Sequence, residues 1–200
     1  MKLVFASNNK HKLEEVRQIL PPTIEIISLR EIGFLQEINE TGTTLEANSA
    51  LKAQEVWDWI VDKSISYHVD GVFADDTGLE IRALGGAPGV RTARWAGDEA
   101  CDINNRKKAL HELKGVEDRV ACFRTVVSLI INGEMQQVEG IVNGQIAIEE
   151  QGNGGFGYDP VFIPEGYNKT FALLSFEEKN AISHRGRAMQ ALRKLIANIE

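Results

Sequence analysis

The sequence predicts a single domain of the α/β class with a partly antiparallel sheet. Short apolar runs that alternate with amphipathic segments indicate strands followed by helices, and one long alternating stretch followed by a turn signal indicates a β-hairpin. Two hundred residues are enough for one substantial core. The chain has no internal repeat or linker-like segment, so we interpret residues 1–200 as one domain.

The amino-terminal segment predicts a strand followed by a helix. Lys2 to Ala6 has the length and apolar character of a short buried strand. Ser7-Asn8-Asn9 then leads into an amphipathic helix that ends before Pro21-Pro22, because proline cannot continue a helix. The apolar residues of this helix are Leu13, Val16, Ile19 and Leu20.

The next predicted helix runs from about Leu45 to Val61. Thr43 and Glu46 have the spacing of a capping box at its start. Asn48 and Lys52 share one face of this helix, because residues four apart are neighbours on a helix surface. Two more helices are expected, at residues 102–113 and at the carboxyl end, where the apolar residues are Ala188, Leu192, Leu195 and Ile199.

Two further segments predict the rest of the sheet. Residues 72–74 are expected to form a second short buried strand that ends at a turn made by Asp75-Asp76-Thr77-Gly78. From Ala121 to Ile131 every second residue can line one apolar face, and Asn132-Gly133 is typical of a type I′ hairpin turn. The partner strand is expected from Met135 to about Ile148.

The charge and the cysteine content narrow the class of protein. A formal net charge of -7 argues against binding to the phosphate backbone of a nucleic acid, which requires a basic surface. Cys101 and Cys122 form no disulfide-type or metal-type motif, and the histidines are too scattered for a zinc site. The amino-terminal apolar run is too short for a signal peptide or a membrane span. We therefore expect a cytoplasmic protein without membrane contact.

The first candidate site is the junction of the first strand and helix, at residues 7–12. Free backbone amides at the start of a helix attract anions, and Ser and Asn side chains such as those of Ser7, Asn8 and Asn9 add donors. Lys12 lies about one turn into the helix and can reach a phosphate as a point charge. The alternative is an ordinary helix cap followed by a solvated basic turn. No Walker A pattern is present.

Acidic residues form a second candidate site. Side chains alternate along a strand, so Asp75 and Asp76 should point to opposite sides, and only one of them can face a given site. A carboxylate at the end of a buried strand suits Mg²⁺, which takes few protein carboxylates and keeps several waters. Glu40 is the candidate second ligand. The alternatives are an ordinary Asp–Gly turn and a solvated loop acid. Asn48 and Lys52 join this site only if their helix face meets Asp76.

The third candidate is the glycine-rich segment from Gly152 to Asp159. Four glycines in six positions carry an entropic cost that packing does not explain, so we expect this loop to approach a partner closely. Phe156 offers a stacking face worth roughly 1–3 kcal/mol per base, and Tyr158 and Asp159 add a phenol and a carboxylate. A flat polar ligand such as a nucleobase fits these groups. The alternative is a glycine-rich hairpin with a core phenylalanine.

The last candidate is Ser183-His184-Arg185. Ser183 is a good N-cap for the final helix. Two cationic side chains in the first turn of a helix oppose its dipole, by roughly 0.3–1 kcal/mol each if charged. His184 and Arg185 do not stabilise the helix at these positions, so we expect them to have a functional role. Lys179 lies just upstream.

Together these residues resemble the inosine/xanthosine triphosphate pyrophosphatase family, whose members hydrolyse deaminated purine nucleotides. Each motif is weak alone, but they occur in family order from residue 3 to the carboxyl-terminal helix, and the ordered set is very specific. The motifs are Ser7-x-Asn9-x-x-Lys12, Glu40-Thr41-Gly42, Glu46-Ala47-Asn48 with Leu51-Lys52-Ala53, Ala74-Asp75-Asp76-Thr77-Gly78-Leu79, Gly85-Gly86-Ala87-Pro88-Gly89-Val90, Thr92-Ala93-Arg94, Gly154-Gly155-Phe156-Gly157-Tyr158-Asp159-Pro160 and Ser183-His184-Arg185-Gly186.

The resemblance implies an elongated mixed β-sheet with flanking helices and two lobes around a central cleft, usually in a homodimer. It implies Mg²⁺-dependent cleavage of ITP, dITP or XTP to the monophosphate and pyrophosphate. Asp76 resembles the family's general base, Glu40 and Asp76 would hold Mg²⁺, and Lys12 and Lys52 would act as cations on the phosphates. The remaining residues would bind or surround the substrate: Ser7, Asn8, Asn9, Thr77, Phe156, Gly157, Tyr158, Asp159, Lys179, His184 and Arg185.

Three departures from the family pattern stand out. Thr77 stands where serine is commoner, Trp95 stands where a smaller aromatic residue is usual, and the stretch from Trp57 to Gly71 is longer than in many relatives. Two other functions remain open. One is a pyrophosphatase for other modified nucleotides, and the other is a nucleotide sensor that binds without hydrolysis.

Overall fold

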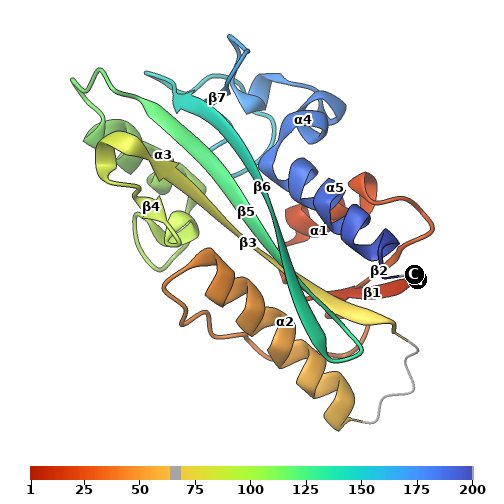
Figure 1. Ribbon diagram of the computed structural model, residues 1–200. Helices are drawn as coiled ribbons and strands as arrows, with labels where there is room; N and C mark the ends of the chain where they lie inside the picture. Colours follow the sequence, from red (N-terminus) through yellow and green to blue (C-terminus); the bar gives the residue numbers. More distant parts are fainter. Residues whose placement is uncertain (64–68, 200) are drawn as a thin grey trace. The chain divides into compact units, whose positions relative to one another are not determined.

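The computed structural model describes residues 1–63 and 69–199 and has the expected α/β architecture (Figure 1). The strands are β1 (Lys2–Phe5), β2 (Glu25–Ser28), β3 (Gly71–Ile81), β4 (Pro88–Gly89), β5 (Val120–Ile131), β6 (Glu134–Ile146) and β7 (Phe162–Pro164). The α-helices are α1 (Lys10–Ile19), α2 (Leu45–Asp62), α3 (Asp102–Glu112), α4 (Phe176–Ile182) and α5 (His184–Ala197). The short 3-10 helices of this described part are η1 (Arg82–Leu84), η2 (Thr92–Arg94) and η3 (Phe171–Leu173). Within the described residues, no helix is both long and apolar enough to span a membrane.

The strands form one mixed sheet. Their order is β2-β1-β3-β5-β6-β7, and β4 pairs with β3 outside this order. β1 runs parallel to both β2 and β3, and its residue Phe5 pairs with Ser28 and Phe73. β4 pairs antiparallel with β3, and β7 pairs antiparallel with β6. The predicted sheet, partly parallel and partly antiparallel, is therefore confirmed.

The chain divides into two compact units. Unit 1 contains Met1–Asp76, Thr125–Gly140 and Arg187–Glu200, and unit 2 contains Thr77–Arg124 and Ile141–Gly186. The divisions fall within β3, β5, β6 and α5, which therefore contribute residues to both units. Each unit has buried apolar residues of its own.

Unit 1 is built in three layers, because successive residues of a strand point to opposite faces. Leu3 and Phe5 of β1 pack with α1 and α5, whereas Val4 and Ala6 pack with α2. Phe73 of β3 belongs to the same layer as Phe5, and the two rings stack with centroids 4.8 Å apart. Figure 1 shows α2 on one side of β1 and β3, and α1 and α5 on the other.

The core of unit 2 is a cluster of aromatic rings. Phe123 of β5 lies edge-on to Phe162 of β7, with centroids 4.8 Å apart, and stacks on His184 at 4.6 Å. Phe171 of η3 lies 5.1 Å from Phe162. α3 packs against this cluster through Ala109, and Leu113 joins it directly after the helix. The rings thus fix segments that carry several of the predicted substrate-binding residues.

The hairpin prediction is confirmed, and the start of α2 needs a correction. Asn132 and Gly133 have φ angles of 53° and 81°, as a type I′ turn requires. α2 begins at Leu45 as predicted, but its N-cap is Thr44 and not Thr43. The Thr44 side chain accepts a hydrogen bond from the backbone N–H three residues later at 3.1 Å. Both threonines are good N-cap residues, but only Thr43 is followed by Glu three residues later, and the register of the helix selects Thr44.

One further prediction is wrong at the end of α5, and another falls partly on residues that the structure does not describe. α5 ends at Ala197, so Ile199 lies beyond the helix whose apolar face it was expected to extend. The stretch from Trp57 to Gly71 includes residues 64–68, which lie outside the described part of the chain.

Candidate active site

Lys12 lies in the first turn of α1 and is paired with an acid. Its Nζ donates to Asp75 Oδ1 at 2.9 Å, and its side chain is 15% exposed. Asn9 is the N-cap of α1: its Oδ1 accepts from the Lys12 N–H at 3.1 Å, and its own N–H donates to Ser7 Oγ at 3.3 Å. Asn8 is exposed beside this cap. The helix-cap alternative therefore accounts for Asn9, but the solvated-turn alternative is wrong for Lys12.

Asp75 and Asp76 point to opposite faces of β3, as the alternation predicts. Asp75 contacts Lys12 of α1, and Asp76 contacts Lys52 of α2 at 3.0 Å. The predicted turn is wrong, because β3 continues through both acids to Ile81. Both carboxylates can be buried here because each has an ammonium partner, which offsets the free energy of burying its charge.

Lys52 joins Glu40 to Asp76. Its Nζ lies 2.6 Å from Glu40 Oε1 and 3.0 Å from Asp76 Oδ1, and its side chain is 8% exposed. Asn48, one turn earlier on α2, donates to Asp76 Oδ2 at 3.4 Å and accepts from the Gly42 N–H at 2.8 Å. A Cβ at Gly42 would lie 2.6 Å from Asn48 Oδ1, so only glycine allows this approach. The α2 face that carries Asn48 and Lys52 therefore does meet Asp76.

Burial and charge act against each other in this cluster. Burial raises the pKa of Asp76, and the positive charges of Lys52 and Lys12 oppose only part of that rise. Burial alone would lower the pKa of Lys52, but the carboxylates of Asp76, Glu40 and Asp75 outweigh it and raise that pKa. Lys52 therefore remains a cation, while Asp76 is a stronger proton acceptor than an exposed aspartate.

Glu40 and Asp76 are the residues of this cluster that could hold a cation together. Both carboxylates contact the same ammonium group, so their oxygens converge on one point. The described residues contain no group of three or more His, Cys, Asp or Glu that could hold a metal. Two carboxylates suit Mg²⁺ when waters and substrate phosphates complete its coordination shell. The donor set therefore fits Mg²⁺ bound together with a phosphate ligand.

In unit 2, contacts within the protein explain three of the four loop glycines, which corrects the expectation that packing cannot. A Cβ at Gly152 or Gly154 would lie 2.9 or 2.8 Å from the Ala172 carbonyl oxygen. A Cβ at Gly155 would collide with the Asp159 carboxylate. The expectation was wrong because it considered only the conformational entropy of glycine. It did not consider that this loop packs tightly against the Ala172 backbone and the Asp159 carboxylate.

Asp159 ties this loop to Lys179. Its Oδ2 accepts from the Phe156 N–H at 2.9 Å and from Lys179 Nζ at 2.7 Å. The two charged side chains are 4% and 7% exposed. Lys179 Nζ lies 4.9 Å from the centroid of the Phe156 ring, and Arg185 Cζ lies 5.8 Å from it. Phe156 therefore presents a partly exposed ring with two cations within the distance at which cations and aromatic faces attract.

Thr77, His184 and Arg185 belong to the same unit as this loop. Arg185 is 2% exposed, and its Nη2 donates to Thr77 Oγ1 at 3.2 Å. His184 is 5% exposed and stacks on Phe123. Ser183 Oγ accepts from the backbone N–H three residues later at 3.0 Å, which confirms the predicted N-cap of α5.

Tyr158 is a core residue as well as a loop residue. Its side chain is 3% exposed and packs in the aromatic core of unit 2. Its hydroxyl donates to the Thr92 carbonyl oxygen at 3.0 Å, and burial raises its pKa. The hydroxyl is thus engaged within the protein, and a contact from Tyr158 to a ligand would come from its backbone.

No sequence signal points to two residues that hold this loop from outside. Asp102 Oδ2 accepts from the Gly157 N–H, and Arg106 Nη1 donates to the Gly157 carbonyl oxygen, both at 2.8 Å. Asp102 and Gly157 are 55 residues apart in the chain. Only the tertiary fold reveals such a contact.

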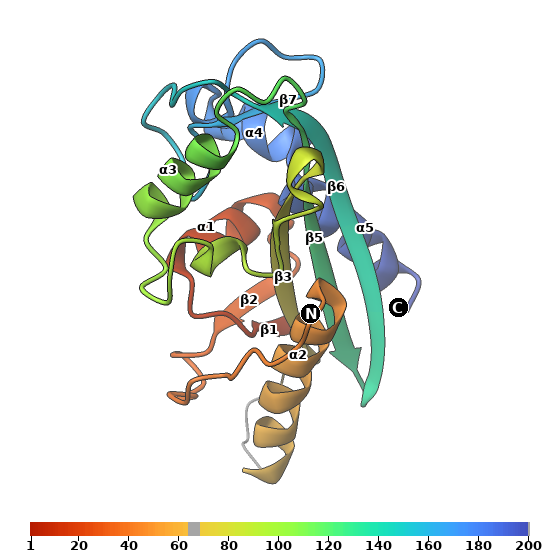
Figure 2. The ribbon, with the colours of Figure 1, turned by 90° about the vertical axis from the view of Figure 1, so that its left-hand side faces the viewer.

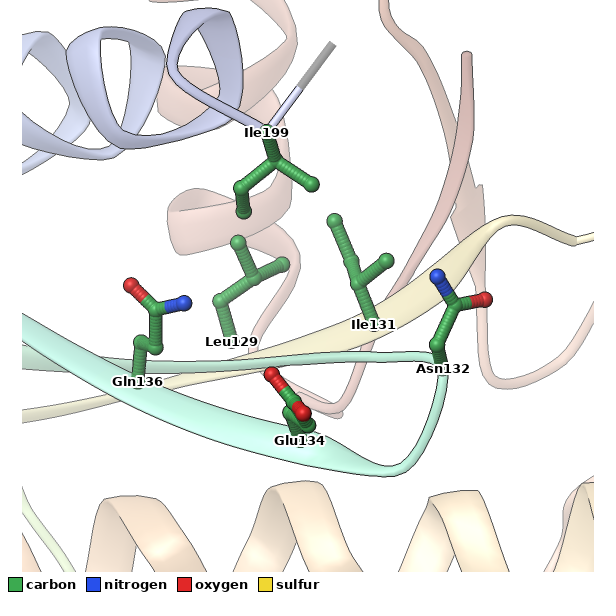
Figure 3. Close-up of a pocket in the computed structure, with 6 residues that line it drawn as sticks. All are labelled: Leu129, Ile131, Asn132, Glu134, Gln136 and Ile199. Atoms are coloured by element: carbon green, nitrogen blue, oxygen red, sulfur yellow. The ribbon is translucent and has the colours of Figure 1, made fainter.

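None of the predicted site residues lines the pocket drawn in Figure 3. This pocket of unit 1 has a volume of about 210 Å³. Its lining residues are Leu129, Ile131, Asn132, Glu134, Gln136 and Ile199. Figure 3 shows Ile199 lying over Leu129 and Ile131, so a residue beyond α5 covers the end of the β5–β6 hairpin.

The two units offer different sets of chemical groups. Unit 1 offers two ammonium groups and two convergent carboxylates, which suit phosphates and a divalent cation. Unit 2 offers an aromatic ring accompanied by cations, which suits a flat base with acceptor groups.

The chain belongs to the Ham1 family, whose model matches residues 3–195. It is 49% identical over 192 residues to the dITP/XTP pyrophosphatase of Flavobacterium psychrophilum, covering 96% of this chain and 97% of that protein. It is 46% identical over 196 residues to the dITP/XTP pyrophosphatase of Flavobacterium johnsoniae, covering 98% of each. The Ham1 protein of Staphylococcus aureus has a similar structure, with a TM-score of 0.84, 36% identity and coverage of 100% of both chains.

Proposed function

We propose that this protein hydrolyses the deaminated purine nucleoside triphosphates ITP, dITP and XTP to the monophosphate and pyrophosphate, with Mg²⁺ as cofactor. The two relatives above carry the name dITP/XTP pyrophosphatase and align with almost the whole chain. The structural observation that carries the proposal is the buried Lys52 ammonium, which the Glu40 and Asp76 carboxylates share.

Lys12 and Lys52 are the proposed phosphate-binding cations. The barrier to attack on a triphosphate is largely electrostatic, so positive charge on the phosphates accelerates the reaction. Carboxylates already hold both ammonium groups in place, so they are oriented before substrate arrives. The donors of Ser7, Asn8 and Asn9 at the start of α1 complete this phosphate site in the proposal.

Asp76 is the proposed general base. Bound Mg²⁺, held by Glu40 and Asp76, would supply positive charge next to the phosphates. Asp76 orients or deprotonates a water molecule whose oxygen forms a bond to the α-phosphorus, while the bond to the pyrophosphate leaving group breaks. Burial raises the pKa of Asp76, which favours proton acceptance. General-base catalysis of this kind contributes about 10²–10⁴-fold to the rate.

Phe156 and its neighbouring cations are the proposed base site. The ring stacks on the purine, and donors from His184, Arg185 and Lys179 pair with the 6-keto oxygen of a deaminated purine. Adenine carries an amino group at this position and would leave those donors unpaired. A site of this kind can reject a mismatched analogue by roughly 10⁴–10⁵-fold. Guanine also has the 6-keto group, so the same donors would not exclude GTP.

We also propose that the protein is a cytoplasmic homodimer that binds neither nucleic acid nor membranes. The family resemblance supports the dimer, the free cysteines support a reducing compartment, and the net charge of -7 supports the absence of nucleic-acid binding. Light scattering would measure twice the chain mass of 22.2 kDa for the dimer. A mass of one chain at micromolar concentration would contradict it.

A substrate panel tests the proposed activity. Purified protein with Mg²⁺ is incubated with ITP, dITP, XTP, GTP and ATP, and the nucleotide products and pyrophosphate are quantified. We expect monophosphate and pyrophosphate from the first three, and complete loss of turnover when EDTA removes the metal. A kcat/KM for ATP within about tenfold of that for ITP would contradict base selection by unpaired donors. Binding without any product would identify a nucleotide sensor, and preference for a pyrimidine would identify a different pyrophosphatase.

A further inference from the structure

We propose that α3 positions the ring of Phe156 through the backbone of Gly157, and that Asp102 and Arg106 are the positioning residues. This inference rests on the proposed function, because it assigns Phe156 to the base of the substrate. It adds two residues that lie outside the motifs described above and that would set affinity for the base without touching it.

One face of α3 holds the backbone of Gly157 on both sides. The Gly157 N–H donates to Asp102 Oδ2, and its carbonyl oxygen accepts from Arg106 Nη1, both at 2.8 Å. Asp102 and Arg106 are four residues apart and therefore neighbours on the helix surface. Arg106 is in turn fixed by Glu150, with Nε 3.0 Å from Oε2. Figure 2 shows α3 beside the loop that follows β6.

Both peptide groups that flank Phe156 are bonded to side chains. The group before it donates through the Phe156 N–H to Asp159 Oδ2 at 2.9 Å. The group after it donates through the Gly157 N–H to Asp102. A peptide group is planar, so the orientations of two successive planes fix φ and ψ of the residue that joins them. Asp159 and Asp102 together therefore set the direction in which the Phe156 side chain leaves the backbone.

Gly157 would otherwise have wide freedom to move. Its φ is +60°, and no atom lies within 4 Å of the place where a Cβ would stand. Gly157 lies in a loop outside the helices and strands. Glycine loses more conformational freedom on ordering than any other residue, so an external restraint has its largest effect here. The restraint keeps the ring near Lys179 and Arg185, at 4.9 and 5.8 Å from its centroid.

Asp102 could instead serve only the stability of α3. It lies in the first turn of the helix, where an acid interacts favourably with the helix dipole. That role predicts a lower melting temperature with no change in the balance between ligands. The positioning role predicts weaker binding of ligands that carry a purine, with unchanged binding of inorganic tripolyphosphate, which has only the phosphates.

The first test compares Asp102→Ala with Asp102→Asn, which can still accept a hydrogen bond from the Gly157 N–H. We expect Asp102→Ala to raise the KM for ITP about tenfold, within the range that base stacking spans. We expect its kcat to stay within about twofold and the inhibition constant of tripolyphosphate to stay unchanged. Asp102→Asn should restore the KM. Asp98→Ala, at an exposed acid just before α3, is the matched control.

The second test asks whether Asp102 acts through the ring. In the Phe156→Ala background, adding Asp102→Ala should raise the KM no further, because residues that act as a unit are not additive. Arg106→Gln independently tests the hydrogen bond to the Gly157 carbonyl oxygen. It should raise the KM for ITP and leave the inhibition constant of tripolyphosphate unchanged. This variant also decides the question if Asp102→Ala does not fold.

Failure of this inference can be separated from failure of the proposed function. If the wild-type protein makes monophosphate from ITP and rejects ATP, while Asp102→Ala and Arg106→Gln leave the KM for ITP unchanged, the positioning role is wrong. An equal loss of tripolyphosphate binding, or a full additional loss in the Phe156→Ala background, also overturns it. If the wild-type protein does not discriminate ITP from ATP, the proposed function itself fails.

Discussion

The two clusters of site residues are positioned by different means. In unit 1 most charged groups of the site lie on regular elements, with Lys12 on α1, Lys52 on α2 and Asp76 on β3, and only Glu40 lies between elements. In unit 2 Phe156 and Gly157 lie in a loop, and hydrogen bonds from other side chains hold their peptide groups. Backbone hydrogen bonding thus places most of the unit 1 charges, whereas individual side chains place the ring.

This difference matches the proposed tasks of the two clusters. Stabilising charge on a phosphate depends steeply on distance, so it benefits from groups fixed by a helix or a strand. Stacking on a base tolerates more variation, because every base offers a flat face. In unit 1 we therefore expect activity to fall when one of the charged groups itself is removed. In unit 2 we also expect activity to fall when a residue that supports the loop is removed.

The largest effect is expected from Asp76→Asn. Loss of the proposed base should lower kcat by about 10²–10⁴-fold, while the fold is retained because asparagine keeps the shape of the side chain. Asp75→Asn changes the opposite face of β3 and should act mainly on substrate affinity, through Lys12. Steady-state kinetics at saturating Mg²⁺ measure both variants. Equal losses of kcat would contradict the assignment of catalysis to one face.

The next largest effect is expected on stability, from Asp159→Ala. This change removes the carboxylate that pairs with the buried Lys179, and breaking a buried ion pair in this way costs about 3–5 kcal/mol of the free energy of unfolding. Asp118→Ala is the control, because its partner Arg82 lies at an exposed position, and it should cost much less. Urea unfolding measures both. If the two losses are the same, Asp159 does not anchor the loop.

A smaller effect is expected from Phe156→Ala. Removing the stacking face should raise the KM for ITP by about 5–150-fold, which corresponds to roughly 1–3 kcal/mol. Phe176→Ala in α4, another partly exposed phenylalanine of the same unit, is the matched control and should leave the KM near that of the wild type. A KM for ITP that is unchanged in the Phe156 variant would remove this ring from the base site.

The smallest effect is expected at the start of α2. Thr44→Ala removes the N-cap of the helix that carries Asn48 and Lys52, and it should lower the free energy of unfolding by about 1 kcal/mol. Thr43→Ala, at the exposed neighbouring threonine, should change it by less. Thermal unfolding of the two variants compares them directly. A larger loss of unfolding free energy for Thr43→Ala would indicate that Thr43 is the N-cap, as the capping box in the sequence predicts.

Spacing along regular elements made part of the site predictable. The helical spacing of Asn48 and Lys52 and the strand alternation of Asp75 and Asp76 both hold in the structure. The turn expected at the two acids is wrong, because a turn signal reports only local preference, whereas β3 is paired with other strands of the sheet and continues through both acids. The contact of Asp102 with Gly157 has no local signal at all, since only tertiary packing brings α3 to the loop.

The adjacent acids of β3 constrain the length of the chain ahead of them. Inserting or deleting one residue between Gly71 and Ala74 would turn the pair over, so that each carboxylate would face the other's lysine. A change of two residues would keep the orientations but move both carboxylates about 7 Å along the strand, beyond the reach of Lys12 and Lys52. Length variation upstream of the acids should therefore be found before Gly71, where it leaves the pairing of β3 with β1 intact.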